Sequence, residues 1–506
     1  MTRQLSQSER TVLDAGTEWL DAHEEALVDL LTELVARPSI TGREGRRDDP
    51  ASTVGHLVAA LEEQVDRTDV VTERLPDEWE YRDGAHRENV YTVLQGGDDG
   101  ALVCTSHTDV VSAGAPDSWP DDDPYSIQRG TVTRVGETTI ELDVAGDRFE
   151  REVRAELARS WDRRGVGDGR SLEALVGRGV YDNKASIVCL VGSLLALEAA
   201  LDDSQTLGGD LVHGHLVDEE VYQVGAKRMV GWDGREGWLD EQYDGYDDFR
   251  AVVLEGSYGF APVIGHRGLV WLELEATGEA AHASTPDLGR NAVVGMAKAL
   301  ADADDPAYAN AVAEQFVEDR LLGETTVAPG TTVVGGDVRA VEDGYVDRGG
   351  LNAIPEWCEA TFDVRIPRWE GFPDGVDEVQ AALCETVERR ARAAGGVEFS
   401  ARIPEHGFFP PVALADDREE AGSHPLVETA IAAATATAGY EPAIEVAPGA
   451  TDAAFVYHGT HAPTLVEYGP AGALSHEPLE FVEREHVLTG AKAMLEFAVR
   501  ELGVLE

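Results

Sequence analysis

The sequence predicts an α/β protein of two domains, the larger of which has a mixed, largely parallel sheet flanked by helices. Three observations support this class. The chain has 506 residues, which suits two domains better than one. Short apolar runs at 102–104, 211–217 and 251–254 have the length and composition of buried strands. Residues 264–412 follow a different order of strands and helices, which indicates an inserted domain.

The larger domain is expected to comprise residues 1–263 and 413–506. Residues His23 to Arg37 alternate as an amphipathic helix that ends at Pro38, because proline cannot continue a helix. Further elements expected here are a buried helix at 184–201, a helix at 425–438 and a strand at 463–467.

An insertion from about residue 127 to 175 interrupts this domain. Thr131 to Asp143 alternates like a hairpin, and Arg148 to Asp162 has a helical pattern. We expect a small excursion over the surface, with shaping of a pocket rim as the alternative.

The inserted domain, residues 264–412, reads β-α-β-β-α-β, which is a ferredoxin-like α+β unit. An additional helical stretch near 307–322 lies outside that order. The expected elements are a strand at 268–277, a helix at 291–302, strands at 331–338 and 357–366, a helix at 376–393 and a strand at 397–403.

The acidic composition limits the partners. The chain has 41 Lys plus Arg against 96 Asp plus Glu, a formal net charge of −55, which argues against nucleic acid and anionic membranes. Because only four of the basic residues are lysines, the composition resembles that of proteins from extreme halophiles. An ordinary acidic protein is the alternative.

The cysteines and the apolar segments bear on the compartment. Cys104, Cys189, Cys358 and Cys384 are widely spaced and form no Cys-x-x-Cys motif, which fits a reducing compartment. Residues 1–20 lack the apolar core of a signal peptide, and the apolar run at 185–197 is short for a membrane span. We therefore expect a cytoplasmic protein without a membrane partner.

Five acidic or histidine positions that follow apolar runs are the candidate metal ligands: His107, Asp182, Glu220, Glu255 and His476. They stand in the motifs His107-Thr108-Asp109, Gly177 to Lys184, Asp218-Glu219-Glu220, Glu255-Gly256-Ser257 and Ser475-His476-Glu477. Each motif alone is more often a solvated acidic turn or an ordinary histidine, but the ordered set points to a metal site. For His213 and His215, which alternate on one expected strand, we favour a packing role.

In this order the motifs resemble the M20 family of metallopeptidases and deacylases. That family includes acetylornithine deacetylase, succinyl-diaminopimelate desuccinylase, aminoacylase and carboxypeptidase G. The resemblance implies that Glu219 is the general base and that Glu220 is a ligand. Asp109 fits a carboxylate that orients the ring of His107, and Glu480, four residues after His476, fits either a carboxylate that supports a ligand or one that starts a helix.

The ligand chemistry agrees with a two-metal site. Two divalent cations carry four positive charges, of which the three carboxylates offset three, so the site favours a bridging hydroxide. Mixed imidazole and carboxylate ligands suit zinc, with cobalt or manganese as alternatives, better than calcium.

The inserted domain carries the remaining candidate residues. The motifs around His282, Asn352 and Arg365 resemble the family's lid. The resemblance implies that His282 reaches the active site of a partner subunit and stabilises an oxyanion, which makes the protein a homodimer. It also implies that Asn352 and Arg365 hold the substrate α-carboxylate, whereas a structural turn and a sheet salt bridge are the alternatives.

We therefore expect a binuclear metallohydrolase that cleaves an amide bond in an N-acyl amino acid or short peptide with a free carboxylate. A dipeptidase or carboxypeptidase is the alternative among enzymes. A catalytically silent relative that binds metabolites is the alternative from another class, although an intact Glu219 argues against it. The acyl group and the side chain that fit the site are left open.

Overall fold

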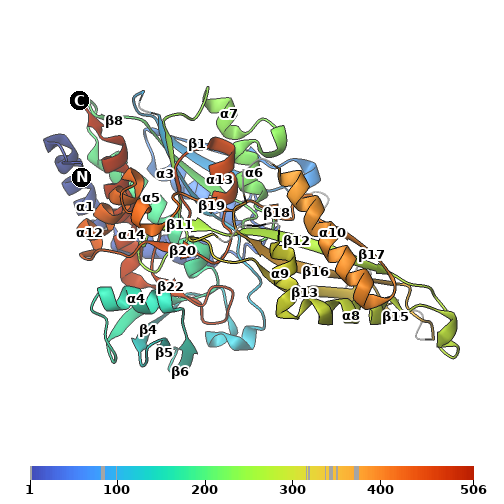
Figure 1. Cartoon of the computed structure of the whole chain (residues 1–506). Coiled ribbons are helices and arrows are strands. Elements are labelled where there is room, and N and C mark those ends of the chain that lie inside the picture. The colour runs from blue at the N-terminus through green and yellow to red at the C-terminus, as the bar shows by residue number, and fades with distance from the viewer. Residues whose placement is uncertain are drawn as a thin grey trace. The chain divides into compact units, whose positions relative to one another are not determined.

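The computed structural model describes residues 3–80, 86–98, 100–314, 316, 319–336, 338–340, 346–348, 352–369 and 375–506 (Figure 1). The chain divides into two compact units. The first unit comprises Met1–Gly265, Leu414–Ala447 and Thr451–Glu506, and the second unit comprises His266–Ala413 and Pro448–Ala450.

A six-stranded sheet in the order β1-β2-β9-β3-β10-β21 forms the centre of the first unit. The four strands β9, β3, β10 and β21 are parallel, whereas β1 and β2 pair antiparallel at one edge. Their bounds are Thr68–Arg74 for β1, Glu88–Leu94 for β2, Ala101–His107 for β3, Asp210–Leu216 for β9, Phe249–Val253 for β10 and Thr464–Leu465 for β21. Every residue of β3 is buried, as expected for a central strand covered on both faces. The predicted mixed, largely parallel sheet is thus confirmed.

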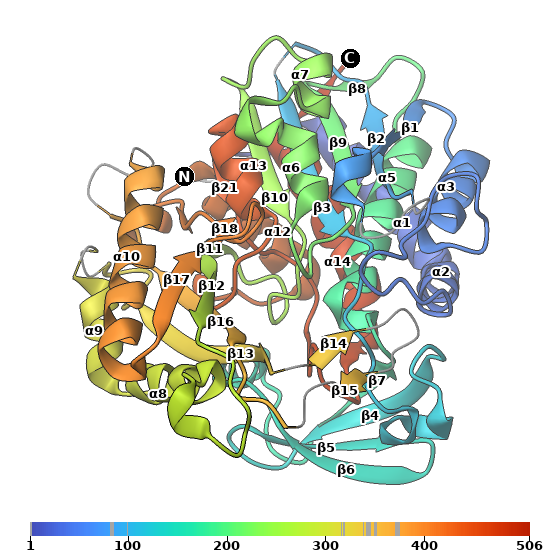
Figure 2. The same cartoon turned by 90° about the vertical axis from the view of Figure 1, so that its right-hand side faces the viewer.

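Helices cover both faces of this sheet (Figure 2). One face carries α1 (Gln7–Ala22), α5 (Ala185–Ala200), α12 (Pro425–Ala438) and α14 (Arg484–Leu502), which pack against one another. The other face carries α6 (Val224–Val230), α7 (Trp238–Gln242) and α13 (Ala453–Thr460). Helices α2 (Glu24–Val35) and α3 (Thr53–Gln64) lie beside the first group, and α11 (Arg418–Ala421) is a single turn before α12.

Helix α5 is the apolar core of the unit. Its side chains are buried from Ala185 to Leu197, between α1 and α14. Together with the preceding turn, the helical segment Val180–Ala200 is long and apolar enough to cross a membrane, and it is the only such segment among the described residues. Because 83% of its most apolar stretch is buried inside the unit, the segment has the environment of a core helix.

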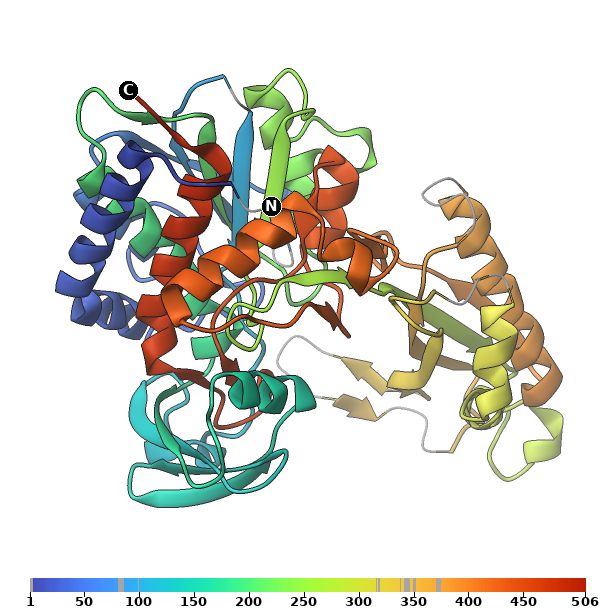
Figure 3. The same ribbon diagram turned by 60° about the vertical axis from the view of Figure 1, so that its left-hand side comes forward.

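The insertion forms most of a second sheet in the first unit, with the order β22-β23-β7-β4-β5-β6 (Figure 3). Its strands are β4 (Gln128–Arg134), β5 (Thr139–Val144), β6 (Asp147–Glu152), β7 (Ser171–Val176), β22 (Gly472–Ala473) and β23 (Phe481–Glu483). Helix α4 (Ala155–Arg163) lies between β6 and β7 in the chain. The predicted β4–β5 hairpin is present, but the prediction of a helix from Arg148 was wrong.

Residues 147–152 form a third strand because Ala145 and Gly146 both take positive φ, the geometry of a tight hairpin turn. Arg148 then pairs with Glu141 and Asp143 across the strands, and Phe149 lies opposite Leu142. Helix α4 begins only at Ala155.

The second unit has a sheet in the order β13-β16-β12-β17, with helices α8 and α10 packed side by side against it. Its bounds are Gly268–Thr277 for β12, Ala292–Ala303 for α8, Thr326–Gly335 for β13, Trp357–Ile366 for β16, Val376–Gly395 for α10 and Glu398–Arg402 for β17. This order and these crossovers are those of the predicted ferredoxin-like unit.

Two details of that unit differ from the prediction. Strand β13 begins five residues earlier than expected and ends at Gly335, since Gly336 turns the chain with positive φ. The additional helix, α9 (Pro306–Ala313), is shorter than predicted. The carboxylate of Asp319 instead accepts the backbone N–H groups of Leu321 and Leu322 in a turn.

Candidate metal centre

Three of the five candidate ligands follow neighbouring parallel strands. His107 ends β3, Glu220 lies four residues after β9, and Glu255 lies two residues after β10. Because the carboxyl ends of parallel strands meet at one edge of a sheet, these side chains converge. The structure adds Asp182 from the turn before α5 and His476 from the loop between β22 and β23.

The distances divide the five residues into two sets that share Asp182. The Nε2 atom of His107 lies 3.0 Å from Asp182 Oδ1 and 3.3 Å from Glu255 Oε1. The Nε2 atom of His476 lies 3.3 Å from Asp182 Oδ2 and 2.8 Å from Glu220 Oε2. Each oxygen of Asp182 therefore faces a different histidine, the arrangement expected of a carboxylate that bridges two cations.

The donor set fits divalent metals. Among the described residues, the buried Oε1 of Glu220 has no hydrogen-bond partner, and the buried Oε1 of Glu255 is contacted by His107 Nε2 at 3.3 Å without hydrogen-bond geometry. Ligand atoms of His107, Asp182 and Glu220 lie within 4.8 Å of one another, as do those of His107, Glu219 and Glu255. Imidazole and carboxylate donors at this spacing suit zinc, cobalt or manganese.

The electrostatics of the cluster favour a cation. Burial and the charge of Asp182 raise the pKa of Glu220 to about 7, and burial raises the pKa of Glu255 to about 7. Hydrogen bonds to Asp182 and Glu220 raise the pKa of His476 to about 10. The closely spaced carboxylates therefore favour positive charge between them. Protons on the neighbouring side chains supply that charge, and a bound metal cation would replace those protons.

A third cluster of possible ligands lies elsewhere, at Glu483, Glu485 and His486. Its Glu483 carboxylate already accepts hydrogen bonds from Trp161 and Arg164, and His486 Nδ1 accepts the backbone N–H of Ala471. Because these side chains already form structural hydrogen bonds, we do not consider this cluster a metal site.

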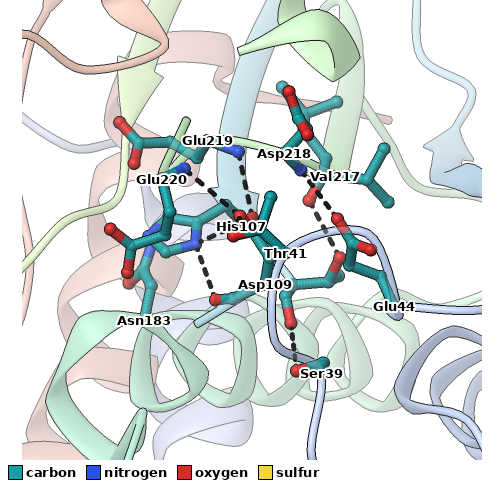
Figure 4. A network of polar contacts seen from close by, with 12 residues as sticks. Ser39, Thr41, Glu44, His107, Asp109, Asn183, Val217, Asp218, Glu219 and Glu220 are labelled. Carbon is teal, nitrogen blue, oxygen red and sulfur yellow. Dashed lines mark hydrogen bonds and ion pairs between the residues drawn. The ribbon is translucent and has the colours of Figure 1, made fainter. Parts of the chain in front are cut away.

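Asp109 connects His107 to the turn that carries the expected base (Figure 4). Its Oδ1 accepts the backbone N–H of Glu219 at 3.0 Å, and its Oδ2 accepts the backbone N–H of Glu220 at 3.2 Å and the hydroxyl of Thr41 at 2.8 Å. His107 Nδ1 lies 3.0 Å from the backbone oxygen of Asp109 and 3.4 Å from its carboxylate. The ring is therefore closer to the carbonyl than to the carboxylate, which chiefly holds the turn.

The side chains of Glu219 and Glu220 diverge from the turn (Figure 4). Glu220 reaches His476, whereas Glu219 Oε1 accepts a hydrogen bond from Gln223 Nε2 at 3.1 Å. Burial raises the pKa of Glu219 well above its ordinary value. A carboxyl group of raised pKa next to the ligands has the properties of a general base for this site.

Glu480 holds the turn that presents Asp182. Its buried carboxylate accepts the backbone N–H groups of Gly179, Tyr181 and Asp182 at 2.9 to 3.0 Å and pairs with Arg178 at 2.6 Å. The Asp182–Asn183 peptide bond is cis. The location of Glu480 agrees with the supporting position expected from the sequence.

The insertion packs beneath the loop that carries His476. Leu474, His476 and Leu479 all adopt positive φ, which is unfavourable for residues other than glycine and needs support from tertiary contacts. Leu474 and Leu479 belong to one apolar core with Trp161 and other side chains of the insertion. The insertion therefore has a structural role next to a candidate ligand.

The candidate residues His282, Asn352 and Arg365 all lie in the second unit. Asn352 Nδ2 is 2.9 Å from His282 Nε2, and the hydroxyl of Ser284 is 2.7 Å from His282 Nδ1. Arg365 forms a bidentate pair with Asp363 at 2.7 and 2.9 Å, the sheet salt bridge that was the alternative to a substrate contact. The glycines and leucine that precede Asn352 lie outside the described residues.

Several buried charged residues near the site belong to none of the motifs that the sequence shows. Glu44 and Arg87 contact the acidic turn from behind, and Asp452 is 1% exposed, its Oδ1 atom having no hydrogen-bond partner in the part of the chain that the structure describes. In a chain with 96 acidic residues, a single Glu or Asp in a loop carries no signal of burial. Arg87 stands just before a strand-like run, and nothing in the sequence around it indicates that its side chain is buried.

Comparison with known proteins agrees with this geometry. A profile of peptidase family M20/M25/M40 matches residues 163–500, more than half of the chain. The succinyl-diaminopimelate desuccinylase of Methylobacterium sp. (strain 4-46) is 25% identical over 455 residues, which cover 88% of each chain. A probable carboxypeptidase of Paracoccidioides brasiliensis (strain Pb18) is 25% identical over 250 residues, 49% of each chain, so the match spans about half of that protein.

Solved structures share the fold. The Bacillus subtilis YXEP protein, described as a dinuclear metal-binding peptidase, superimposes with a TM-score of 0.52 at 14% identity, covering 95% of this chain and 99% of that one. The family profile and the ordered site motifs show that the chain belongs to peptidase family M20/M25/M40 and is a hydrolase of that family.

Proposed function

We propose that the protein is a binuclear metal-dependent amidohydrolase that removes an acyl group from an N-acyl amino acid or a related small amide with a free carboxylate. The single observation that carries the proposal is the position of Asp182, whose two oxygens face His107 and His476 separately. The similarity to a desuccinylase over most of the chain favours deacylation.

The chain's own residues have distinct tasks in this reaction. His107, Asp182 and Glu255 would hold one cation, and His476, Asp182 and Glu220 the other. Bound cations would lower the pKa of a water and polarise the amide carbonyl.

Glu219 would take a proton from the attacking water and pass it to the leaving amine, consistent with its raised pKa. Asp109 keeps Glu219 in place because it accepts that residue's backbone N–H.

The second unit supplies the proposed substrate and dimer contacts. Strand β13 is at the edge of its sheet and exposes Val333 and Val334, and neighbouring α8 exposes Val294. Apolar side chains along the edge strand of a sheet favour association with a second copy of the chain. In that homodimer His282 would reach the partner's site, and Asn352 with Arg365 would bind the substrate carboxylate.

The guanidinium of Arg365 already pairs with Asp363. To bind a substrate carboxylate, it must either break that ion pair or contact both carboxylates at once. A dipeptidase or carboxypeptidase activity is the second candidate function, favoured by the probable carboxypeptidases among the relatives.

The experiment is a hydrolysis panel of N-acetyl amino acids, N-succinyl amino acids and dipeptides, with zinc, cobalt or manganese added. We expect the acylated amino acids to be cleaved fastest, and Glu219→Gln serves as the matched inactive control. Faster cleavage of dipeptides would favour the second candidate. A protein that binds two metals but cleaves no amide would be a silent relative.

A further inference from the structure

A buried arginine, Arg87, lies behind the turn that carries the candidate base. Its side chain is 1% exposed and donates to three carboxylates and one carbonyl. The distances are 2.6 Å to Asp218 Oδ1, 2.9 Å to Glu80 Oε2, 3.3 Å to Glu44 Oε1 and 2.8 Å to the backbone oxygen of Trp79. This geometry uses the several fixed donors of a guanidinium, which lysine cannot reproduce.

Asp218 is the member of this group that controls the turn. It adopts a φ of +70°, a left-handed conformation that is unfavourable for aspartate unless contacts hold it. Its Oδ2 accepts the backbone N–H of Tyr222 at 3.2 Å, and its backbone oxygen accepts the N–H of Gln223 at 2.7 Å. Its own N–H donates to Glu44 Oε1 at 3.1 Å (Figure 4). The same oxygen of Glu44 accepts a hydrogen bond from Arg87.

The turn is thus clamped from two sides. Asp109 accepts the N–H groups of Glu219 and Glu220 on the side of His107, while Asp218 is fixed on the opposite side. The backbone at Asp218 sets the direction in which the next side chain leaves the turn. Gln223, held by its N–H to Asp218, then donates to Glu219 Oε1 at 3.1 Å.

We propose that Arg87 is a positioning residue for the hydrolysis: through Asp218 and Glu44 it fixes the left-handed turn that aims the Glu219 carboxylate. The inference rests on the proposed function, since it assumes that Glu219 is the base. Arg87 contacts Asp218 and Glu44 directly, so the turn carries its effect to Glu219.

Removal of the guanidinium leaves Asp218, Glu44 and Glu80 as buried acids without their shared cation. Buried carboxylates that lose their shared partner repel one another and draw in water, and this relaxes the contacts they made. Displacements of about 1 Å at a reacting group can lower turnover about 100-fold. The predicted loss is therefore one of kcat rather than of substrate or metal binding.

The test uses the metal-loaded protein and the best substrate of the hydrolysis panel. Arg87→Met should lower kcat by about 10- to 100-fold, with KM changed less than about threefold and two metals per chain retained. Arg87→Lys should recover part of kcat, because an ammonium restores charge to Asp218 but not the full set of hydrogen bonds.

The matched control is Arg134→Met. Arg134 is also buried and bonds to Asp162 and to the backbone oxygen of Val166, at the end of β4 opposite to Gln128, which pairs with Val176 before the turn of Asp182. It should lower the free energy of unfolding without changing kcat. An equal loss of kcat in the Arg134 variant would show that any buried arginine has this effect, and would overturn the proposal.

A double-mutant cycle with Glu219→Gln separates positioning from a general structural effect. If Arg87 acts through Glu219, Arg87→Met should cause little further loss once Glu219 is already Gln. Losses that multiply would overturn the proposal. Where Arg87→Met does not fold, Arg87→Lys and Asp218→Asn take its place in the same cycle.

Failure of this inference is distinguishable from failure of the proposed function. If Glu219→Gln alone keeps normal turnover, the base assignment is wrong. If Glu219→Gln is inactive while Arg87→Met keeps full kcat, only the positioning role is wrong.

Discussion

Asp109 accepts the backbone N–H of Glu219 at 3.0 Å, so the residue beside His107 also holds the turn of the expected base. A candidate ligand and the candidate base are therefore linked through one buried carboxylate. The same carboxylate also accepts the N–H of Glu220, so it holds two consecutive backbone groups of the acidic turn.

The first prediction concerns Glu219. Glu219→Gln keeps the size of the side chain but removes its ability to take a proton, so turnover should fall by about 10²- to 10⁴-fold. Two metals should remain bound, because Glu219 lies outside the two ligand sets. Steady-state kinetics and metal analysis measure both quantities. The control, Glu220→Gln, should lose metal as well as turnover; near-normal turnover in Glu219→Gln would show that another group is the base.

The second prediction concerns His282. His282→Ala should lower turnover strongly without loss of metal, because the histidine belongs to the second unit and not to either ligand set. In a homodimer with a histidine donated between subunits, mixing His282→Ala with Glu219→Gln chains should restore some activity. In each hybrid dimer, one site would then combine an intact Glu219 with an intact His282 from the other subunit. If subunits exchange and the mixture stays inactive, the histidine acts within its own chain or the dimer is not the active form.

The third prediction concerns pH and His213. Burial lowers the pKa of His213 to about 3 from its ordinary value of 6.5. Above pH 6.5 the histidine is neutral in both folded and unfolded chains and has no effect. Below pH 6.5 the unfolded chain binds the proton and the folded chain does not, so stability falls as pH falls towards 3. At pH 5 this difference amounts to about 2 kcal/mol.

The measurement is urea unfolding of His213→Leu and of the unchanged protein at pH 7 and pH 5, in the same high salt. The variant should lose about 2 kcal/mol less between the two pH values. Val212→Ala, at a buried residue of the same strand that cannot titrate, should alter stability but leave its pH dependence unchanged. Equal pH dependence in His213→Leu would contradict the prediction.

The fourth prediction concerns salt. With 96 acidic against 41 basic residues, like-charge repulsion should weaken the fold in dilute buffer, and at 1 M salt the screening length falls to about 3 Å. We expect the fold to persist in molar potassium chloride and to lose structure on dialysis into dilute buffer. Circular dichroism over a salt series measures this, and a signal indifferent to salt would reject halophilic adaptation.

Local patterns predicted the strands because each strand depends on residues close in sequence, whereas the candidate site residues were chosen because their ordered motifs resemble those of a known family. β3, β9 and β10 read as apolar runs followed directly by polar motifs, so His107, Glu220 and Glu255 could be placed at strand ends. The third strand of the insertion was missed because Phe149 is its only apolar residue, and its pairing depends on a turn at Ala145 and on cross-strand charges.

Long-range contacts could not be predicted. Arg87 and Asp218 are 131 positions apart, and Glu44 and Asp218 are 174 apart, so no local pattern reveals that they meet. The sequence also left open whether Arg365 pairs with Asp363, because residues two apart on a strand lie on the same face and either partner is possible.

The central claim is that Asp182 joins two metal sites, and titration of the chelator-treated protein with zinc, followed by calorimetry, tests it most directly. The account predicts two equivalents bound per chain and fewer than two in Asp182→Ala, which removes both shared oxygens. A single equivalent, no binding, or an unchanged two equivalents in Asp182→Ala would contradict it.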